Sequence, residues 1–211
     1  PESIGNPRVF VGPLGEARVV KPYELDYQNN AACVGGGTRV YGAQAWRFHP
    51  DDFRMASKYG VPEGSSLADW PITYETLEPF YERAEWEFGA AGNGNSIQHQ
   101  IPRKRNYPLR PVDPSPQTVA LQNAAGRLGW VTTPVPLLIN TEPYGGRAAC
   151  IECKYCVGFA CPTDAKSGTQ NTVIPRAIAT GNCELRTSTI AEVVETDERG
   201  NVAGVSYLDH W

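Results

Sequence analysis

The order of the apolar patterns along the chain most constrains its fold, because helix-like and strand-like segments do not alternate. Strand-like runs lie near the two ends, in 7–20 and 183–209, each interrupted by a turn. Helical periodicity lies between and beside them, in 73–88, in 115–128 and in part of 169–180. Without βαβ alternation a self-contained parallel sheet is disfavoured. We therefore expect a mixed, α+β fold in which two hairpins accompany helices and long loops.

The helix at 73–88 has the clearest boundaries. Thr73 is a candidate N-cap and Gly89 ends the pattern. Pro79 lies inside the pattern and predicts a kink or a separate first turn. The apolar stripe that we expect this helix to bury consists of Leu77, Phe80, Tyr81, Ala84 and Phe88.

Composition and charge disfavour both nucleic acid as a partner and a membrane-spanning segment. The 211 residues carry a net charge of −4 and no long basic run, which disfavours nucleic acid as a ligand. The short basic run 103–105 is expected to be solvated surface rather than an anion site. No apolar run approaches the ~20 residues that a membrane span needs.

A run of three glycines, Gly35, Gly36 and Gly37, followed by Thr38, is the first chemical candidate. Consecutive glycines allow positive φ angles and let backbone N–H groups approach a ligand closely. The run is neither a GxGxxG fingerprint nor a Walker loop. Taken alone it is typical of a tight turn.

Four of the six cysteines fall within twelve residues, with the spacing C-x2-C-x2-C-x4-C-P, at Cys150, Cys153, Cys156 and Cys161. The spacing differs by one residue from the bacterial ferredoxin run, so an iron–sulphur cluster is one interpretation. Lys154 and Lys166 would offset thiolate charge. Zinc fits less well, because its ligands usually form two more distant pairs. Loop packing without metal, or disulfides in an oxidising compartment, is the equally weighted alternative. Cys33 and Cys183 are expected to be buried small hydrophobes.

Three stretches in this order resemble the glucose–methanol–choline (GMC) flavin oxidoreductases, in particular their bacterial sugar- and glycoside-oxidising branch. The stretches are VGGGTRVYGAQAWRFHPDDF, DWPITYETLEPFYERAE and the segment from the first clustered cysteine to CELRT. The resemblance runs from about residue 29 to 209. It implies FAD as cofactor and a sugar or other alcohol as substrate.

The resemblance also assigns residues to the flavin. The residues that would line it are Gly35, Gly36, Gly37, Thr38, Gly42 and Ala43, and Ala191 would contact adenine through its backbone. Arg39 stands where some sugar-oxidising relatives carry a flavin-linked histidine, so noncovalent FAD is expected. Some sugar dehydrogenases of the family hold a three-iron cluster in the region of the clustered cysteines, which would pass electrons to a haem partner.

Departures from the family pattern imply an internal piece of a longer flavoenzyme. The GxGxxG unit of the ADP site and a context that names a catalytic histidine are both missing from this sequence, so no catalytic residue is assigned. We expect 1–53 to be part of the FAD-binding domain and 54–165 to belong to the substrate domain with its cysteine-rich loop. The segment 166–211 would return to the FAD domain as a helix and hairpin, and the rest of the flavoenzyme chain would complete the fold.

The leading hypothesis is thus an FAD-dependent dehydrogenase or oxidase that acts on an alcohol group of a sugar or glycoside, with a long-chain alcohol as the second choice of substrate. An iron–sulphur electron-transfer module without flavin is the rival from another class. A metal-free structural or partner-binding domain is the third hypothesis.

Overall fold

The arrangement of the chain is taken from a computed structural model. It describes residues 8–12, 14–21, 23–25, 27, 31–94 and 101–209.

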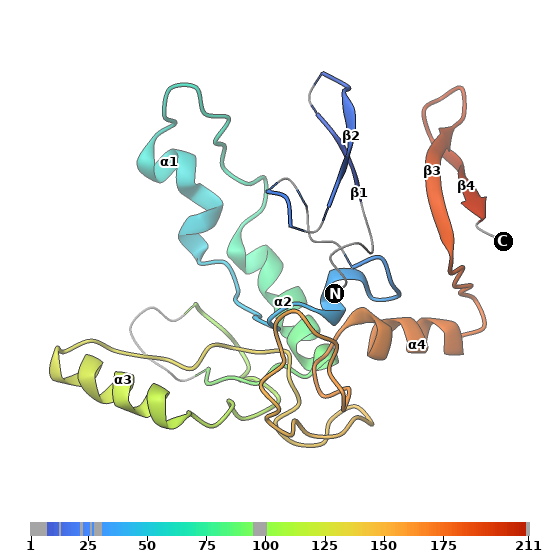
Figure 1. Cartoon of the computed structure of the whole chain (residues 1–211). Coiled ribbons are helices and arrows are strands. Elements are labelled where there is room, and N and C mark those ends of the chain that lie inside the picture. The colour runs from blue at the N-terminus through green and yellow to red at the C-terminus, as the bar shows by residue number, and fades with distance from the viewer. Residues whose placement is uncertain are drawn as a thin grey trace.

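Two separate antiparallel hairpins make up the sheets of the described residues. β1 (Arg8–Val11) pairs with β2 (Ala17–Val20), and β3 (Thr189–Thr196) pairs with β4 (Val202–Asp209). The hairpins stand apart as two projecting arms (Figure 1). The predicted mixed fold is confirmed at this level, although β3 begins six residues later than the strand-like sequence suggested.

Helices begin and end close to the positions that the sequence predicts. α2 (Tyr74–Phe88) has Thr73 as its N-cap and Gly89 in the left-handed conformation after its last turn. α3 (Pro116–Arg127) is capped by Ser115, and α4 (Val173–Ala179) follows the short 3-10 helix η3 (Thr169–Asn171). Pro79 causes no break, because α2 is continuous through it.

A second short helical segment follows the glycine-rich loop. The 3-10 helix η2 (Pro50–Arg54) leads directly into α1 (Met55–Tyr59). Its N-cap is His49, whose side chain accepts from the backbone N–H of Asp51, while the carboxylate of Asp52 accepts from the backbone N–H of His49 at 2.7 Å. His49 and Asp52 thus form a reciprocal cap at the start of η2.

The buried face of α2 differs from the predicted apolar stripe. Its buried residues are Tyr74, Glu78 and Glu85, whereas Phe80 is 63% exposed. The prediction of the face was only partly right, since Leu77, Tyr81 and Phe88 are half-buried but Ala84, like Phe80, is exposed. The fully buried carboxylates are drawn inward by a cation from another segment, described below.

Backbone pairing between irregular segments forms the centre of the molecule. Leu138 donates its N–H to the carbonyl of Ala43 at 2.7 Å, and Ser167 donates to the carbonyl of Leu138 at 2.9 Å. Ala91 and Leu137 exchange two further hydrogen bonds. The residues buried here are mostly small, so the glycine-rich loop, the end of α2 and the segment after the cysteines come close together.

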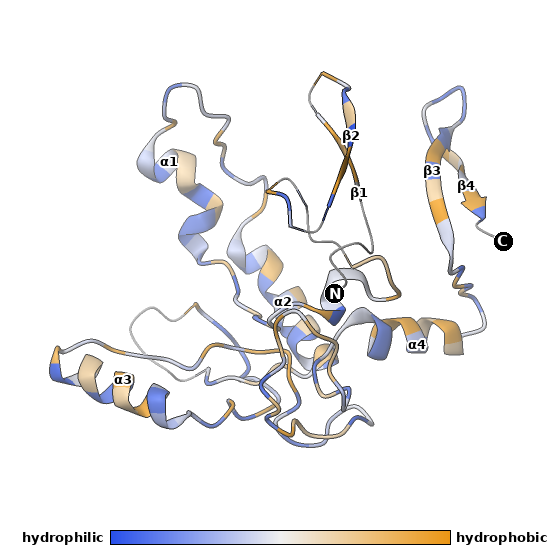
Figure 2. Cartoon of the chain, viewed as in Figure 1, coloured by the Kyte–Doolittle hydropathy of each residue, from blue (hydrophilic) through white to orange (hydrophobic). Residues whose placement is uncertain are grey.

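Much apolar surface remains uncovered. The chain exposes 15088 Å², whereas a folded monomer of its mass, 23.0 kDa, is expected to expose about 9,600 Å². Hydrophobic residues colour both hairpins in Figure 2, and Val194 and Val205 are 61% and 50% exposed. The C-terminal hairpin therefore has an uncovered apolar face within the described residues.

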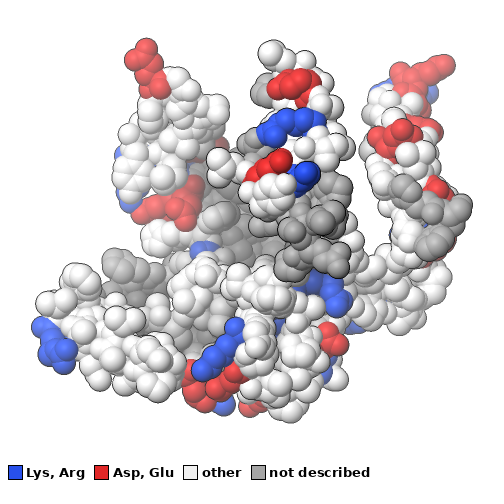
Figure 3. All heavy atoms as spheres, in the orientation of Figure 1, with Lys and Arg blue, Asp and Glu red and all other residues white. Residues whose placement is uncertain are grey.

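Charged side chains of both signs are mixed on the face drawn in Figure 3, where the described residues form no extended basic surface. Within the described chain, the helices are too short or too polar to cross a membrane.

Candidate functional site

The glycine run forms a tight turn with a bare outer surface. Gly35 has φ 95° and Gly36 has φ 52°, and the 3-10 helix η1 (Gly36–Arg39) follows. Thr38 closes the turn, because its hydroxyl and its N–H both bond to the carbonyl of Gly35. A methyl group built on Gly36 or Gly37 would meet no atom within 4 Å. One side of this backbone is therefore open to a planar ligand.

Gln170 packs on the turn at Gly35. A Cβ on Gly35 would lie 2.3 Å from Gln170 Oε1, and a Cβ on Gly168 would meet the same atom at 2.3 Å. Gln170 Oε1 is itself buried and has no hydrogen-bond donor in the described part of the chain. Because a buried acceptor is normally satisfied, this amide fits a site whose ligand supplies an N–H or O–H group.

Polar contacts join the glycine turn to the segment that follows the cysteines. The N–H of Thr169 donates to Thr38 Oγ1 at 3.1 Å, and Tyr41 donates its hydroxyl to the carbonyl of Ser167 at 2.7 Å. Burial raises the pKa of Tyr41 to about 12, against a smaller opposing effect of the Arg147 charge. Tyr41 is therefore a neutral, anchored side chain that fixes the turn.

The four clustered cysteines line one small cavity beside this turn, together with Lys166. Lys166 is 3% exposed, and its ammonium donates to the carbonyls of Tyr41 and Phe159 at 3.0 and 2.9 Å and to that of Cys156. Positive φ angles at Glu152 and Lys154 fold the loop back on itself. A single buried cation thus ties the cysteine loop to the glycine turn.

The thiols differ in their surroundings. Burial raises the pKa of Cys156, and the neighbouring thiol of Cys150 adds to this effect. The pKa of Cys161 is lowered although burial opposes the shift, because the backbone N–H of Lys166 and the hydroxyl and N–H of Thr163 stabilise its thiolate.

The cysteine arrangement does not fit a metal as it stands. All six cysteines are free, and no three side chains among the described residues have the placement of metal ligands. The sequence interpretation as an iron–sulphur site at these four positions stays a prediction, and we derive no chemistry from it. Cys33 and Cys183 are exposed, so the expectation that they are buried was wrong.

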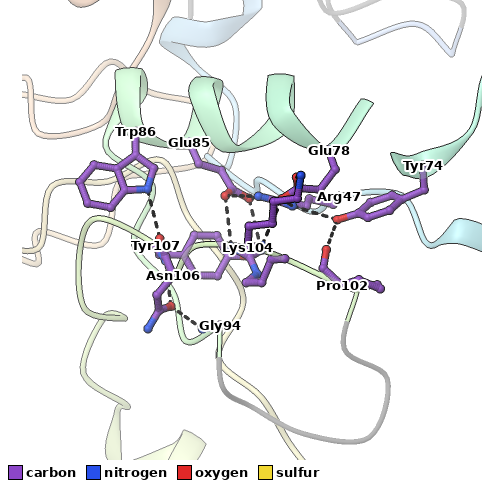
Figure 4. A network of polar contacts seen from close by, with 11 residues as sticks. Arg47, Tyr74, Glu78, Glu85, Trp86, Gly94, Pro102, Lys104, Asn106 and Tyr107 are labelled. Atoms are coloured by element: carbon purple, nitrogen blue, oxygen red, sulfur yellow. Dashed lines mark hydrogen bonds and ion pairs between the residues drawn. The ribbon is translucent and has the colours of Figure 1, made fainter. Parts of the chain in front are cut away.

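A buried ionic network behind the turn was missed from the sequence. Arg47, 4% exposed, donates from Nε and Nη2 to the two carboxylate oxygens of Glu85 at 2.8 and 2.7 Å, and from Nη1 to Glu78 at 3.3 Å. Figure 4 shows Arg47 lying between these glutamates and the hydroxyl of Tyr74. The hydrogen bonds from Arg47 to Glu85 and Tyr74 raise the pKa of the guanidinium although burial opposes this. Arg47 therefore stays charged and fixes the glycine-loop segment to α2.

Arg103 contributes to the same network, which corrects its assignment to solvated surface, whereas Lys104 and Arg105 are exposed as predicted. Arg103, with a side chain only 11% exposed, lies 3.1 Å from Glu85. Lys104 lies 3.8 Å from Glu78, and Arg105 instead covers the indole of Trp86. The three basic residues thus have three different environments.

The family model of the GMC oxidoreductases matches residues 27–210. The chain belongs to the GMC oxidoreductase family. It is 36% identical over 176 residues to 6'''-hydroxyparomomycin C oxidase of Streptomyces lividus, which is 83% of this chain and 32% of that protein. It is 31% identical to fructose dehydrogenase large subunit of Gluconobacter japonicus and to paromamine 6'-oxidase of Streptomyces fradiae, each over 83% of this chain and 31% of the relative. The chain therefore spans about a third of the length of these relatives.

Membership of the GMC family implies FAD, and the residues near the glycine turn fit such a group. The open backbone at Gly36 and Gly37 and the orphaned amide of Gln170 would face it. Gly42 packs on Val157, and Ala43 is completely buried, so the methyl group of Ala43 is closed to a ligand here.

Other residues suggested by the sequence do not gather at this turn. Ala191 lies in β3, opposite Tyr207, on the hairpin that stands apart from η1 in Figure 1. Its assignment to adenine stays a prediction. His49 serves as a helix cap, and His99 and His210 lie outside the described residues.

Proposed function

We propose that this chain is part of an FAD-dependent oxidoreductase that oxidises an alcohol group of a sugar or glycoside. Two oxidases that the chain resembles have paromamine or a paromomycin derivative in their names, and a third relative is a fructose dehydrogenase subunit. The single observation that carries the proposal for this chain is the open glycine backbone next to the buried, unsatisfied Gln170.

Bound FAD would supply a hydride acceptor, so that the alcohol loses a hydride to the flavin and its hydroxyl proton to a base. Gly36 and Gly37 would admit the ring close to the backbone. Gln170 would accept a hydrogen bond, and Thr38 and Tyr41 would hold the turn in place. We assign no base to this chain, and the substrate site and the electron acceptor belong to the proposal for the whole enzyme.

The flavin step is tested with Gly37→Ala in the full-length protein. A Cβ at Gly37 meets nothing within 4 Å and Gly37 does not have a positive φ, so the apoprotein should keep its stability. We expect at least about tenfold weaker FAD binding, equivalent to ~1.4 kcal/mol, in titrations followed by flavin fluorescence. Gly126→Ala, an equally open glycine within α3, is the matched control and should bind FAD as the wild type does.

Two results would overturn this assignment. One is a wild-type protein that is purified without flavin and binds none. The other is a Gly37→Ala variant with unchanged FAD affinity, which would move the ring away from the glycine turn.

A non-sugar alcohol is the second candidate substrate. It is favoured by the 33% identity over 183 residues to 2-methyl-1,2-propanediol dehydrogenase of Mycolicibacterium austroafricanum. Flavin reduction by a panel of hexoses, aminoglycosides and short diols distinguishes the two candidates. Reduction by diols alone would exclude the sugar assignment.

A further inference from the structure

A second pocket lies on the far side of α2 from the Arg47 network. Its volume is about 490 Å³, and four segments distant in the sequence form its walls. The residues that line it are Arg83, Trp86, Glu87, Arg105, Tyr144, Gly145 and Arg176. Nothing in the proposed flavin chemistry uses these residues.

Positive charge is in excess in this pocket. Three guanidinium groups face one carboxylate, that of Glu87, which leaves a net formal charge of +2. Glu87 lies 2.8 Å from Arg83 and 3.6 Å from Arg176, so a single acidic group holds two cations at the rim. The whole chain has a net charge of −4, so the excess is a local property.

The third guanidinium is positioned by an aromatic ring. Arg105 lies over the Trp86 ring, 3.1 Å from its centroid, and meets no carboxylate at ion-pair distance among the residues that the structure describes. The indole is itself held, because Trp86 Nε1 donates to the carbonyl of Asn106 at 3.1 Å. Tyr144 donates its hydroxyl to the backbone carbonyl of Trp86 at 2.6 Å. Arg105 thus lines the pocket with its guanidinium stacked on a ring that the protein holds in place.

We propose that this pocket binds a small oxyanion with two negative charges, of the phosphate class. Guanidinium groups match the paired oxygens of such an anion and are more weakly hydrated than ammonium groups. Two unbalanced positive charges match the charge of a phosphate or phosphate monoester. Binding here does not depend on the proposed flavin function.

The test is isothermal titration of the full-length holoenzyme with inorganic phosphate and, separately, with a hexose phosphate, both at constant ionic strength set with chloride. We expect saturable binding of phosphate that chloride does not reproduce. Tighter binding of the hexose phosphate identifies a phosphorylated small molecule as the source, and equal binding identifies free phosphate.

Variants link the binding to the pocket. Arg105→Gln and Arg176→Gln should each weaken phosphate binding roughly tenfold, since each removes a charge-assisted donor. Arg127→Gln is the control, because Arg127 is an exposed arginine at the end of α3, outside the pocket. Thermal unfolding of each variant separates loss of binding from loss of fold.

Three outcomes would overturn the proposal. They are no heat beyond that of chloride, an equal loss of binding in Arg127→Gln, and displacement of phosphate by an acidic peptide that binds more tightly. The last result would assign the pocket to a protein partner instead.

Discussion

Arg47 and Glu85 form a two-pronged ion pair in the interior, with Nε–Oε1 and Nη2–Oε2 distances of 2.8 and 2.7 Å. Both side chains are almost fully covered, at 1% and 6% exposure. The pair joins the segment after the glycine turn to the last turn of α2. Removal of one partner leaves a buried charge uncompensated, which is far more costly than loss of a surface pair.

Glu85→Gln should therefore lower the free energy of unfolding of the full-length protein by about 3 kcal/mol in urea denaturation. Glu82→Gln, a substitution on the same helix at a position outside the network, should change it by less than ~0.5 kcal/mol. In the double variant with Arg47→Met, the loss should be smaller than the sum of the two single losses. Additive losses would mean that the pair does not interact in solution.

Gly35 and Gln170 make a second close contact, and it predicts the cost of a side chain in the turn. Gly35→Ala places a methyl group 2.3 Å from Gln170 Oε1 at a residue with φ 95°. The left-handed conformation alone costs about 1–2 kcal/mol, and the overlap adds to it. Gly36→Ala, with φ 52° and nothing within 4 Å, should lose only the stability that the left-handed conformation costs a non-glycine residue.

Thermal unfolding of the apoprotein checks this order. Gly35→Ala should melt at a lower temperature than Gly36→Ala, and Gln170→Ala should recover part of the difference in the double variant. Equal melting temperatures for the two single variants would contradict the packing of Gln170 on the turn.

Substitution of Lys166 should have a large effect, although no acidic side chain among the described residues lies at ion-pair distance from it. Its ammonium is the donor to the carbonyls of Tyr41, Cys156 and Phe159. Lys166→Met would leave these buried acceptors without a donor, at a cost of about 3 kcal/mol. Lys154→Met, an exposed lysine of the same loop, should cost less than ~0.5 kcal/mol.

Limited proteolysis locates this effect. The cysteine loop of Lys166→Met should be cleaved faster than that of the wild type, whereas the loop of Lys154→Met should not. Unchanged cleavage in both variants would show that the lysine does not secure the loop.

The bounds of α2 could be predicted because its signals are local. Thr73 bonds to the N–H of Thr76, and Gly89 takes the left-handed conformation that ends the helix. Its buried face could not be predicted, because a carboxylate is buried only where a cation meets it. That cation is Arg47, 38 residues before Glu85, and helical periodicity contains no information about it.

The candidate site was predicted in pieces. The glycine run and the clustered cysteines each have a visible pattern, but their adjacency depends on Lys166, Ser167 and Thr169, whose contacts span 125 to 131 residues. A lysine amid small residues was the available signal. The sequence interpretation assigned Lys166 to offset thiolate charge. In the structure its ammonium also donates hydrogen bonds to three backbone carbonyls.

Tyr41 provides a test that uses pH. Its phenol has a pKa raised to about 12 in the fold, chiefly by burial, against 10.0 for the free side chain. Between these pH values the unfolded chain loses the proton first. The stabilising difference is therefore complete below pH ~10 and is lost as the pH rises towards ~12.

Tyr41→Phe should lower stability near neutral pH by about 1 kcal/mol, because the hydrogen bond to the Ser167 carbonyl is lost. Above pH ~10 the stability of this variant should fall less steeply than that of the wild type, since one titrating group has been removed. Tyr155→Phe, at an exposed tyrosine of the cysteine loop, should keep the wild-type pH dependence. The free energy of unfolding of the wild type and of both variants is measured by denaturant titration at intervals of half a pH unit. Parallel curves for Tyr41→Phe and the wild type would mean that the phenol is not buried against Ser167, and the glycine turn would then lack the anchor inferred for it.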